Sequence, residues 1–494
     1  MKGDSIYRAN HSIWIAVTLL LSGIFCILTL RFSGGFWFPD EIFQTMEPAF
    51  SIVTGKGVLS WEFTTKARGM LYPFLLSVWM RAVFLFSNEP ATLYVASRAM
   101  LALFFLWAVG TIWFRFKRTM IDSDGFSASI SPWIWNLVFS AVLVCFPLIY
   151  YFGFRTLTDS IAGTLTLVAL FALPDSRARP RLLLHFLLGV LLGLSYGIRF
   201  QTGLFLAFWA PAYALQMWLS EKKILSAFAL GFGIFVSLAL YAVSDYVYYG
   251  IPFISSINYF KATVIDEVGN KYGTSPFGFY FQMYDRYLGF MLIFLIPGSI
   301  KLRRWWPVLF AVSAFVLVHA CIAHKDLRYL FFTFPILLYC IAVGILASYQ
   351  FIRIRWSDRW AMAFLSIVLL GVVAHQTQLL RKKIPWNMGE EVMQAHFQAH
   401  KAGIHGNLLI GYTEVFATSG GFVYLGREFK GNLFFFNLQN QSRSEIRRIL
   451  DESKIDFALL HETQIAWHCA NIGLCEPVWR AGGYVWVKGP ARLK

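Results

Sequence analysis

Two adjacent carboxylates, Asp40 and Glu41, follow the first long apolar segment of the chain, in the stretch FPDEIFQTMEP. Charged side chains are costly at a membrane boundary, so a carboxylate pair there is a candidate functional site. A carboxylate in that place can accept the proton of an acceptor hydroxyl. Asp40 is therefore the candidate general base, and Glu41 is its supporting partner or an alternate base. A structural alternative stays open, because the stretch is also typical of a short helix with Asp40 as its N-cap.

Cations at the ends of apolar segments are the second group that can do chemistry. Lys and Arg side chains bind phosphate, and the guanidinium fork fits it especially well. The candidate phosphate ligands are Arg68, Arg155, Arg199, Lys271, Lys325 and Arg328. For each of them, snorkelling to the membrane interface is the structural alternative. That alternative is weakest in AHKDLRY, where His324 and Asp326 stand among Lys325 and Arg328.

Membrane helices must position these side chains. The chain has 494 residues, of which 57% are hydrophobic and 18% aromatic, and its mean hydropathy is +0.56. One soluble core cannot absorb so much apolar surface. A helix needs about 20 apolar residues to cross a ~30 Å hydrocarbon core, and the sequence predicts about eleven such spans. They are 12–30, 92–114, 132–152, 158–174, 182–197, 202–218, 224–246, 285–299, 305–322, 330–348 and 360–380.

The formal net charge of +16 indicates topology rather than a nucleic-acid partner, because the basic residues gather at every second boundary between apolar segments. Short basic loops face the cytoplasm. The groups are Lys2 and Arg8; Arg115, Lys117 and Arg118; Arg177, Arg179 and Arg181; Lys222 and Lys223; Lys301, Arg303 and Arg304; Arg353, Arg355 and Arg359. The short segment 71–86 contains Arg81 and is interpreted as an amphipathic segment that lies on or re-enters the outer face. Residues 31–91 then form one long external loop.

The composition changes near residue 383 from membrane-like to that of an ordinary soluble domain. We therefore expect a transmembrane domain over 1–382 and a small extracytoplasmic α/β domain over 383–494. Alternating apolar patterns predict strands at 407–413, 456–462 and 482–489 and a helix at 443–453. Cys469 and Cys475 lie in this domain, where an oxidising compartment permits a disulfide, but their spacing alone does not decide it.

This topology places five polar segments on the outer face, which are 31–91, 153–159, 198–203, 247–284 and 323–329. A lipid-phosphate-linked substrate fits such a face, because its tail lies in the bilayer while its phosphate meets cations at the water boundary. No Cys or His spacing typical of zinc is present, and no G-x-x-x-x-G-K-[ST] sequence occurs. The sequence therefore predicts no metal site and no nucleotide hydrolysis, and it leaves a divalent ion as an open question.

The same polar segments carry a family resemblance. In chain order they read FPDEIFQTMEPA, LSWEF with RGMLYP, FRTLTDS, NKYGTSPFGFYF and HKDLRYLFFTFP. They resemble the signature segments of glycosyltransferase family 22 of the C-type (GT-C) superfamily, the mannosyltransferases of glycosylphosphatidylinositol-anchor and lipid-linked oligosaccharide assembly. The sequence departs from that pattern at several positions. Phe38 and Ser275 each stand where the family has His, Phe277 and Gly278 where Trp and His are usual, Asp159 where it has Asn, and Asp326 where it has Glu.

The resemblance implies a GT-C membrane fold and an inverting transferase that takes a sugar, with mannose the first choice, from a polyprenyl-phosphate donor. The acceptor would be a lipid-linked glycan or a glycolipid. Asp40 would be the base, with Glu41 beside it. His324, Lys325, Arg328, Arg68, Arg155 and Arg199 would bind the donor phosphate. Gln44, Trp61, Glu62, Lys271, Tyr272 and Thr274 would line the donor and acceptor loops.

Two other classes share some of these features. A different GT-C enzyme, of the protein O-mannosyltransferase or lipid A aminoarabinose transferase type, would have the same architecture and first-loop carboxylate. A lipid or glycolipid transporter would also have many spans with charges, but internal repeat symmetry is expected there and is not found. We expect a bacterial inner-membrane protein with a periplasmic site, and the endoplasmic reticulum membrane with a lumenal site is the alternative.

Overall fold

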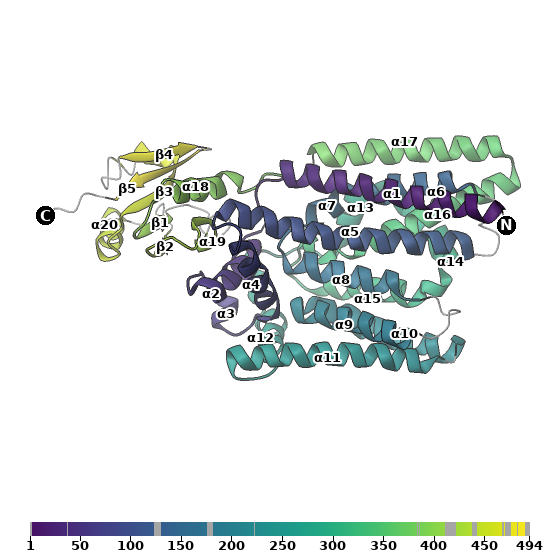
Figure 1. The fold of residues 1–494 in the computed structure, drawn as a ribbon, viewed down its shortest axis with the longest axis horizontal. Coiled ribbons are helices and arrows are strands. Elements are labelled where there is room, and N and C mark those ends of the chain that lie inside the picture. The colour runs from purple at the N-terminus through teal and green to yellow at the C-terminus, as the bar shows by residue number, and fades with distance from the viewer. Residues whose placement is uncertain are drawn as a thin grey trace. The chain divides into compact units, whose positions relative to one another are not determined.

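The structure is a computed structural model of the whole chain (Figure 1). It describes residues 2–36, 38–122, 130–174, 181–221, 223–382, 384, 386–410, 421–436, 442–466, 469, 476–481 and 483–489. These residues form two compact units. The first is the helical membrane unit, made of Met1–Thr29, Thr65–Leu71 and Met100–Ile384. The second is the loop and sheet unit, made of Leu30–Thr64, Tyr72–Ala99 and Pro385–Lys494.

Long apolar helices make up most of the membrane unit (Figure 1). They and the shorter helices between them are α1 (Lys2–Phe32), α5 (Pro90–Asp122), α6 (Pro132–Phe139), α7 (Pro147–Gly153), α8 (Thr158–Ala172), α9 (Leu182–Ile198), α10 (Gln201–Glu221), α11 (Ile224–Tyr249), α12 (Ile254–Phe260), α13 (Phe279–Leu288), α14 (Leu295–Lys301), α15 (Trp306–Cys321), α16 (Thr333–Arg355) and α17 (Asp358–Lys382). The first turns of α5 and the last turn of α1 belong to the loop and sheet unit.

Six helices in the described part of the chain are long and apolar enough to cross a membrane, namely α1, α5, α11, α15, α16 and α17. The pair α6 and α7, bent by 56°, would make a seventh span. Two further predicted spans are helical as α8 and α9, but 15 and 17 residues fall short of the ~20 needed to cross. The predicted count of about eleven is therefore not confirmed, although a multi-pass membrane protein is.

Two segments show why hydropathy alone miscounts. The predicted span 285–299 is broken, because Gly289 has a φ of 54° and ends α13 before a 3-10 turn and α14 follow. The segment 71–86 forms α4 (Leu71–Phe84), whose 14 residues rise only about 21 Å. That length agrees with an amphipathic segment that does not cross the membrane.

Glycines fix the contact between α9 and α11. A Cβ added to Gly189 would overlap the carbonyl of Leu230, and one added to Gly233 would overlap the carbonyl of Phe186. Small residues at such positions let two membrane helices approach backbone to backbone. The two helices are therefore held in a fixed register along this contact.

The loop and sheet unit contains a five-stranded sheet of order β2-β1-β3-β5-β4. Strands β2, β1 and β3 run parallel, and β5 pairs antiparallel with both β3 and β4. Its elements are α2 (Glu47–Thr54), α3 (Trp61–Thr64), α4, α18 (Glu390–Lys401), β1 (Leu408–Ile410), α19 (Phe422–Leu425), β2 (Leu433–Phe435), α20 (Arg443–Glu452), β3 (Phe457–His461), β4 (Pro477–Ala481) and β5 (Tyr484–Lys488).

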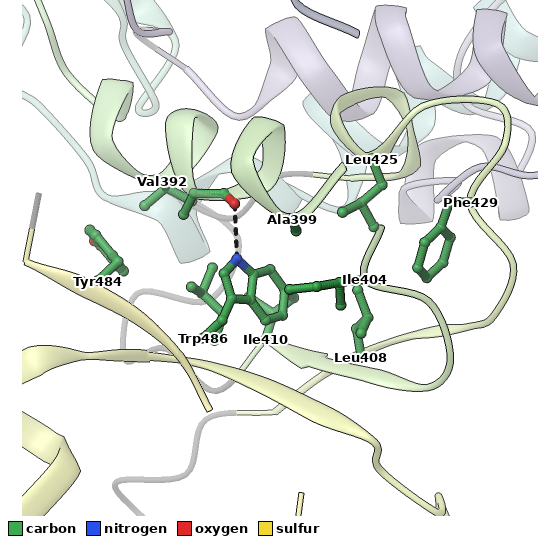
Figure 2. Packing of buried hydrophobic residues seen from close by; sticks show 11 residues of the cluster. Val392, Ala399, Ile404, Leu408, Ile410, Leu425, Phe429, Tyr484 and Trp486 are labelled. Atoms are coloured by element: carbon green, nitrogen blue, oxygen red, sulfur yellow. Dashed lines mark hydrogen bonds between the residues drawn. The ribbon is translucent and has the colours of Figure 1, made fainter. Parts of the chain in front are cut away.

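Side chains alternate between the two faces of this sheet, as the pleat requires. On one face Leu408, Ile410 and Trp486 pack against α18 and α19 (Figure 2), and the Trp486 indole donates to the Ala395 carbonyl at 2.9 Å. On the other face the sheet packs against α20. The sheet is thus covered on both sides by helices.

The predicted strands at 407–413, 456–462 and 482–489 are confirmed in β1, β3 and β5, and the predicted helix in α20. Residues 411–413 lie outside the described residues. The sequence analysis missed β2, which is three residues long, and β4, which begins with a proline. Cys469 is in a disulfide, and Cys475 lies outside the described residues.

Candidate functional site

A narrow pocket opens in the membrane unit where α8 and α10 begin and the 3-10 turn Leu327–Leu330 precedes α16. In the sequence each of these points is the junction of a polar external segment with an apolar helix. The pocket is lined by Asp159, Arg199, Gln201, Thr202, Phe315, Arg328, Tyr329 and Phe332. The structure therefore brings two of the predicted phosphate ligands, Arg199 and Arg328, to one site.

A buried ion pair forms one wall of this pocket. Asp159 lies in the first turn of α8, and its Oδ1 is 3.0 Å from Nε of Arg199, which caps the C-terminus of α9. The Arg199 guanidinium also donates to Oε1 of Gln201 at 2.6 Å and to the Thr158 hydroxyl at 3.4 Å. Both charged side chains are more than nine-tenths buried. The other carboxylate oxygen of Asp159, Oδ2, is buried without a hydrogen-bond partner among the described residues.

A second ion pair involves Arg328, which also lines the pocket. Nε of Arg328 lies 3.1 Å from Oδ2 of Asp326, whose Oδ1 accepts the Arg328 backbone N–H at 3.1 Å. The Tyr329 ring lies near both guanidinium groups, 5.3 Å from Cζ of Arg199 and 5.5 Å from that of Arg328. Cation–π contacts of this kind hold guanidinium planes in a defined orientation. Each cation thus pairs with a carboxylate and lies near the Tyr329 ring.

The polar segments 247–284 and 323–329 contact each other. Nζ of Lys325 donates to the Ser275 carbonyl at 2.7 Å, and Nδ1 of His324 is 2.9 Å from the Gly273 carbonyl. Burial lowers the pKa of Lys325. Lys271, Tyr272 and Thr274 are exposed on the partner loop. His324 and Lys325 thus make backbone contacts to the loop at 273–275 and do not line the pocket.

The remaining predicted phosphate ligands lie elsewhere in the membrane unit. The Arg68 guanidinium lies 5.7 Å from the Tyr259 ring centroid, and the Arg68 carbonyl accepts the Tyr249 hydroxyl at 2.8 Å. Arg155 is fully buried, and its Nε donates to the Tyr151 carbonyl at 3.2 Å. Neither arginine lines the pocket.

The predicted catalytic carboxylates lie in the loop and sheet unit. The Phe43 backbone N–H donates to the Pro39 carbonyl at 2.8 Å, so Asp40 lies inside the first helical turn instead of at the N-cap position. Its side chain is half-buried, whereas Glu41 is only 3% exposed. Burial and the nearby charge of Glu41 raise the pKa of Tyr72. Of the two carboxylates, Asp40 is therefore the more exposed.

Two further predicted residues of the first loop contact each other. Nε2 of Gln44 donates to Oε1 of Glu62 at 2.6 Å, and both side chains are buried. Trp61, next to Glu62, is 38% exposed. The hydrogen bond ties α3 to the π-helical turn Ile42–Met46 that follows Asp40.

Glu47 was not singled out by the sequence analysis, yet it is fully buried at the head of α2. Its Oε1 accepts the Val423 backbone N–H and its Oε2 the Val58 backbone N–H, each at 2.7 Å. Burial raises the pKa of Glu47 to about 7, although these hydrogen bonds lower it. The carboxyl group thus joins the first external loop to the C-terminal segment within one unit.

Asp159 was expected only as a departure from the family pattern, whereas Asp326 was expected both as such a departure and as a member of the charged AHKDLRY segment. Tyr329 was not predicted as a site residue. A carboxylate at the head of an apolar helix, as in TLTDSIAGTL, was a signal that could have found Asp159. Among the described residues, no group of three or more His, Cys, Asp or Glu side chains could hold a metal ion.

The fold and the family can now be compared with known proteins. The solved structure of ArnT from Cupriavidus metallidurans bound to undecaprenyl phosphate matches with a TM-score of 0.59 over 97% of this chain and 98% of that one, at 11% identity. The likeness shows that the two chains share a fold. The family model of the Alg9-like mannosyltransferase family matches residues 22–403. The chain belongs to this family.

The chain is similar to several GPI mannosyltransferases. GPI alpha-1,2-mannosyltransferase 3 of Bos taurus is 26% identical over 66% of this chain, and that of Homo sapiens is 25% identical over 74%. GPI mannosyltransferase 3 of Yarrowia lipolytica is 26% identical over 68%. The matched regions span 57%, 61% and 63% of the lengths of these relatives.

Proposed function

We propose that the protein is an inverting mannosyltransferase that moves mannose from a polyprenyl-phosphate donor to a glycolipid or lipid-linked glycan acceptor. The pocket that holds Arg199 and Arg328 together carries the proposal. Two guanidinium groups near one aromatic ring suit a sugar phosphate. They bind the charge of the phosphate and stabilise the phosphate as it leaves the sugar. The family and the names of the relatives support mannose as the sugar and a GPI-type lipid as the acceptor.

The reaction is a single displacement at the anomeric carbon. A bond forms from the acceptor oxygen to that carbon, and the bond from carbon to the phosphate oxygen breaks. Asp40 takes the proton of the acceptor hydroxyl, and the electron pair of the broken bond leaves with the polyprenyl phosphate. Since cations of the protein meet that charge, we expect no nucleotide and no obligatory metal ion to be needed. The assignment of the base rests on the family resemblance and on the accessibility of Asp40.

The site faces away from the cytoplasm in this proposal, because the basic loops are on the other side of the membrane. The eukaryotic sources of the named relatives favour the endoplasmic reticulum lumen, and the bacterial source of ArnT favours a periplasmic site. Fractionation of the native cells with a tagged chain distinguishes the two.

The test is transfer by the purified full chain in liposomes. We expect mannose from polyprenyl-phosphate mannose to appear on a mannosylated GPI lipid, or on a lipid-linked oligosaccharide offered in a parallel reaction. The Arg199→Met and Arg328→Met variants should lose the transfer. Product analysis by mass spectrometry identifies the sugar and the acceptor. Absence of transfer to either acceptor would contradict the proposal.

A further inference from the structure

Asp159 lines the pocket, and one of its carboxylate oxygens is buried without a hydrogen-bond partner among the described residues. Burying such an oxygen unpaired costs free energy, so its presence needs an explanation. Oδ1 of Asp159 is 3.0 Å from Nε of Arg199, but Oδ2 has no hydrogen-bond partner among the described residues. The residue is 7% exposed, so bulk water does not supply the missing hydrogen bonds. Buried polar atoms without a partner call for an explanation. Among the described residues, Oδ2 of Asp159 and Oδ1 of Asp245 are the carboxylate oxygens of this kind, and of these two residues Asp159 lines the pocket.

The chemistry of the surroundings limits what that ligand can be. A second anion is excluded, since Oδ2 is itself an anionic acceptor and needs a donor. A guanidinium is already supplied by Arg199 on the other oxygen. Neutral donors remain, and among them hydroxyl groups make strong hydrogen bonds to a carboxylate oxygen. A sugar carries several of them.

The position of the hydroxyl follows from the neighbouring cation. In the proposed function Arg199 binds the donor phosphate, and the transferred sugar is bonded directly to that phosphate. The Asp159 carboxylate is paired with the Arg199 guanidinium. The sugar is therefore the part of the donor that we expect beside the carboxylate. Phe315 and Tyr329 line the same pocket, and their aromatic rings offer apolar contact to the faces of a sugar ring.

We infer that Oδ2 of Asp159 accepts a hydrogen bond from a hydroxyl of the transferred sugar, which makes Asp159 a specificity residue for the donor. Oδ1 meanwhile positions Arg199 on the phosphate. The Asp159 carboxylate thus binds a hydroxyl of the sugar through one oxygen and orients Arg199, which binds the leaving phosphate, through the other. The inference rests on the proposed function, because it takes the pocket as the donor site.

The experiment is a double-mutant cycle between the side chain and the substrate. Initial rates of the full chain in liposomes are measured with polyprenyl-phosphate mannose and with its monodeoxy analogues, each lacking one sugar hydroxyl. Removing a hydroxyl also changes the intrinsic reactivity of the donor, but this change is the same for every variant and cancels. For wild type, one analogue should lose about tenfold or more in kcat/KM, the value of a hydrogen bond to a charged group. In Asp159→Ala the same analogue should show no loss of kcat/KM relative to polyprenyl-phosphate mannose beyond the change in intrinsic reactivity.

Two further variants separate recognition from folding. Asp159→Asn keeps the shape and an oxygen for Arg199 but removes the charge, so the loss for that analogue should shrink to a few-fold. Asp245→Asn is the matched control. Asp245 is also fully buried, with Oδ2 bonded to the Ser255 backbone and hydroxyl and with Oδ1 unpartnered among the described residues, but it does not line the pocket. Its variant should show the wild-type losses with every analogue.

The outcomes are distinguishable. If wild type transfers mannose but all analogue losses are the same in Asp159→Ala and Asp159→Asn as in wild type, the inference is wrong and the proposed function stands. If wild type transfers nothing, the proposed function fails and the inference fails with it. Should a variant transfer too slowly for rates, the same cycle is read from the thermal stabilisation that each donor gives without acceptor. Equal stabilisation differences in all variants would again overturn the inference.

Discussion

Oε1 of Glu47 accepts the backbone N–H of Val423 at 2.7 Å, so a carboxyl group of the first external loop binds the C-terminal segment within the loop and sheet unit. The two residues are 376 positions apart in the chain. Because the pKa of this carboxyl group is raised to about 7 by burial, the strength of the connection depends on pH near neutrality.

The first prediction concerns Glu47 and pH. The folded pKa of about 7 lies above the ordinary 4.5, so the folded state holds a proton that the unfolded chain releases. The bound proton stabilises the folded state fully below pH 4.5. As the pH rises through 7 this contribution is lost, and the free energy of unfolding falls by up to about 3 kcal/mol. Glu47→Gln should abolish this pH-dependent loss, measured as the thermal midpoint in detergent. The variant should also be less stable at low pH, because an amide offers only one acceptor to two backbone N–H groups. A pH profile parallel to that of wild type would contradict the assignment.

The second prediction concerns His396, which is fully buried in α18 with Nδ1 2.8 Å from the Val392 carbonyl. Burial lowers the pKa of His396 to about 4 from its ordinary 6.5. The unfolded chain therefore binds more protons between these values, and stability rises with pH from 4 to 6.5 by about 3 kcal/mol.

This rise in stability with pH opposes the fall in stability caused by Glu47. The effect of His396 is therefore best measured in the Glu47→Gln background. There the thermal midpoint should increase from pH 4 to 6.5, and adding His396→Phe should remove the increase. Equal slopes with and without the histidine would show that another group titrates.

The third prediction tests Asp40 as the base. Asp40→Asn keeps the shape of the first helical turn but cannot accept a proton, so transfer should fall by about 10²-fold or more while the protein still accumulates in the membrane. Asp266→Asn, an exposed carboxylate of the segment 247–284, serves as the control and should transfer normally. Near-normal transfer by Asp40→Asn would leave the residue a structural role.

The fourth prediction separates Arg328 from Lys325. Arg328 lines the pocket, so Arg328→Lys loses the guanidinium fork and should raise the donor KM about tenfold. Nζ of Lys325 instead donates to the Ser275 carbonyl. Lys325→Met should therefore lower the thermal midpoint by about one degree, since a hydrogen bond of about 1 kcal/mol is lost, and leave the donor KM near wild type. The reverse pattern would place the phosphate at Lys325.

Hydropathy and motif order predicted the membrane class and most helix positions, because long apolar segments leave a backbone few alternatives to a helix. The crossing count was less predictable, since it depends on breaks such as the one at Gly289. A positive φ at one residue divides a span without changing its composition.

The site was predictable in part for a similar reason. Arg199 and Arg328 were recognised as cations on the outer face, but their meeting depends on how α9 and the 3-10 turn before α16 pack. Asp159 pairs with a residue 40 positions later in the chain, which no local spacing indicates. Glu47 was missed because its two partners are backbone N–H groups, and these leave no mark in a sequence.

The glycine contact between α9 and α11 has a consequence for distant mutations. Arg199 caps α9, ten residues and about 15 Å along the helix from Gly189. Where backbone touches backbone, a larger side chain at Gly189 cannot be accommodated by a rotamer change, so the whole of α9 must tilt or turn. The guanidinium at its end would move with it. A glycine with no chemical group of its own is therefore a place where natural variation can weaken donor use while the fold survives.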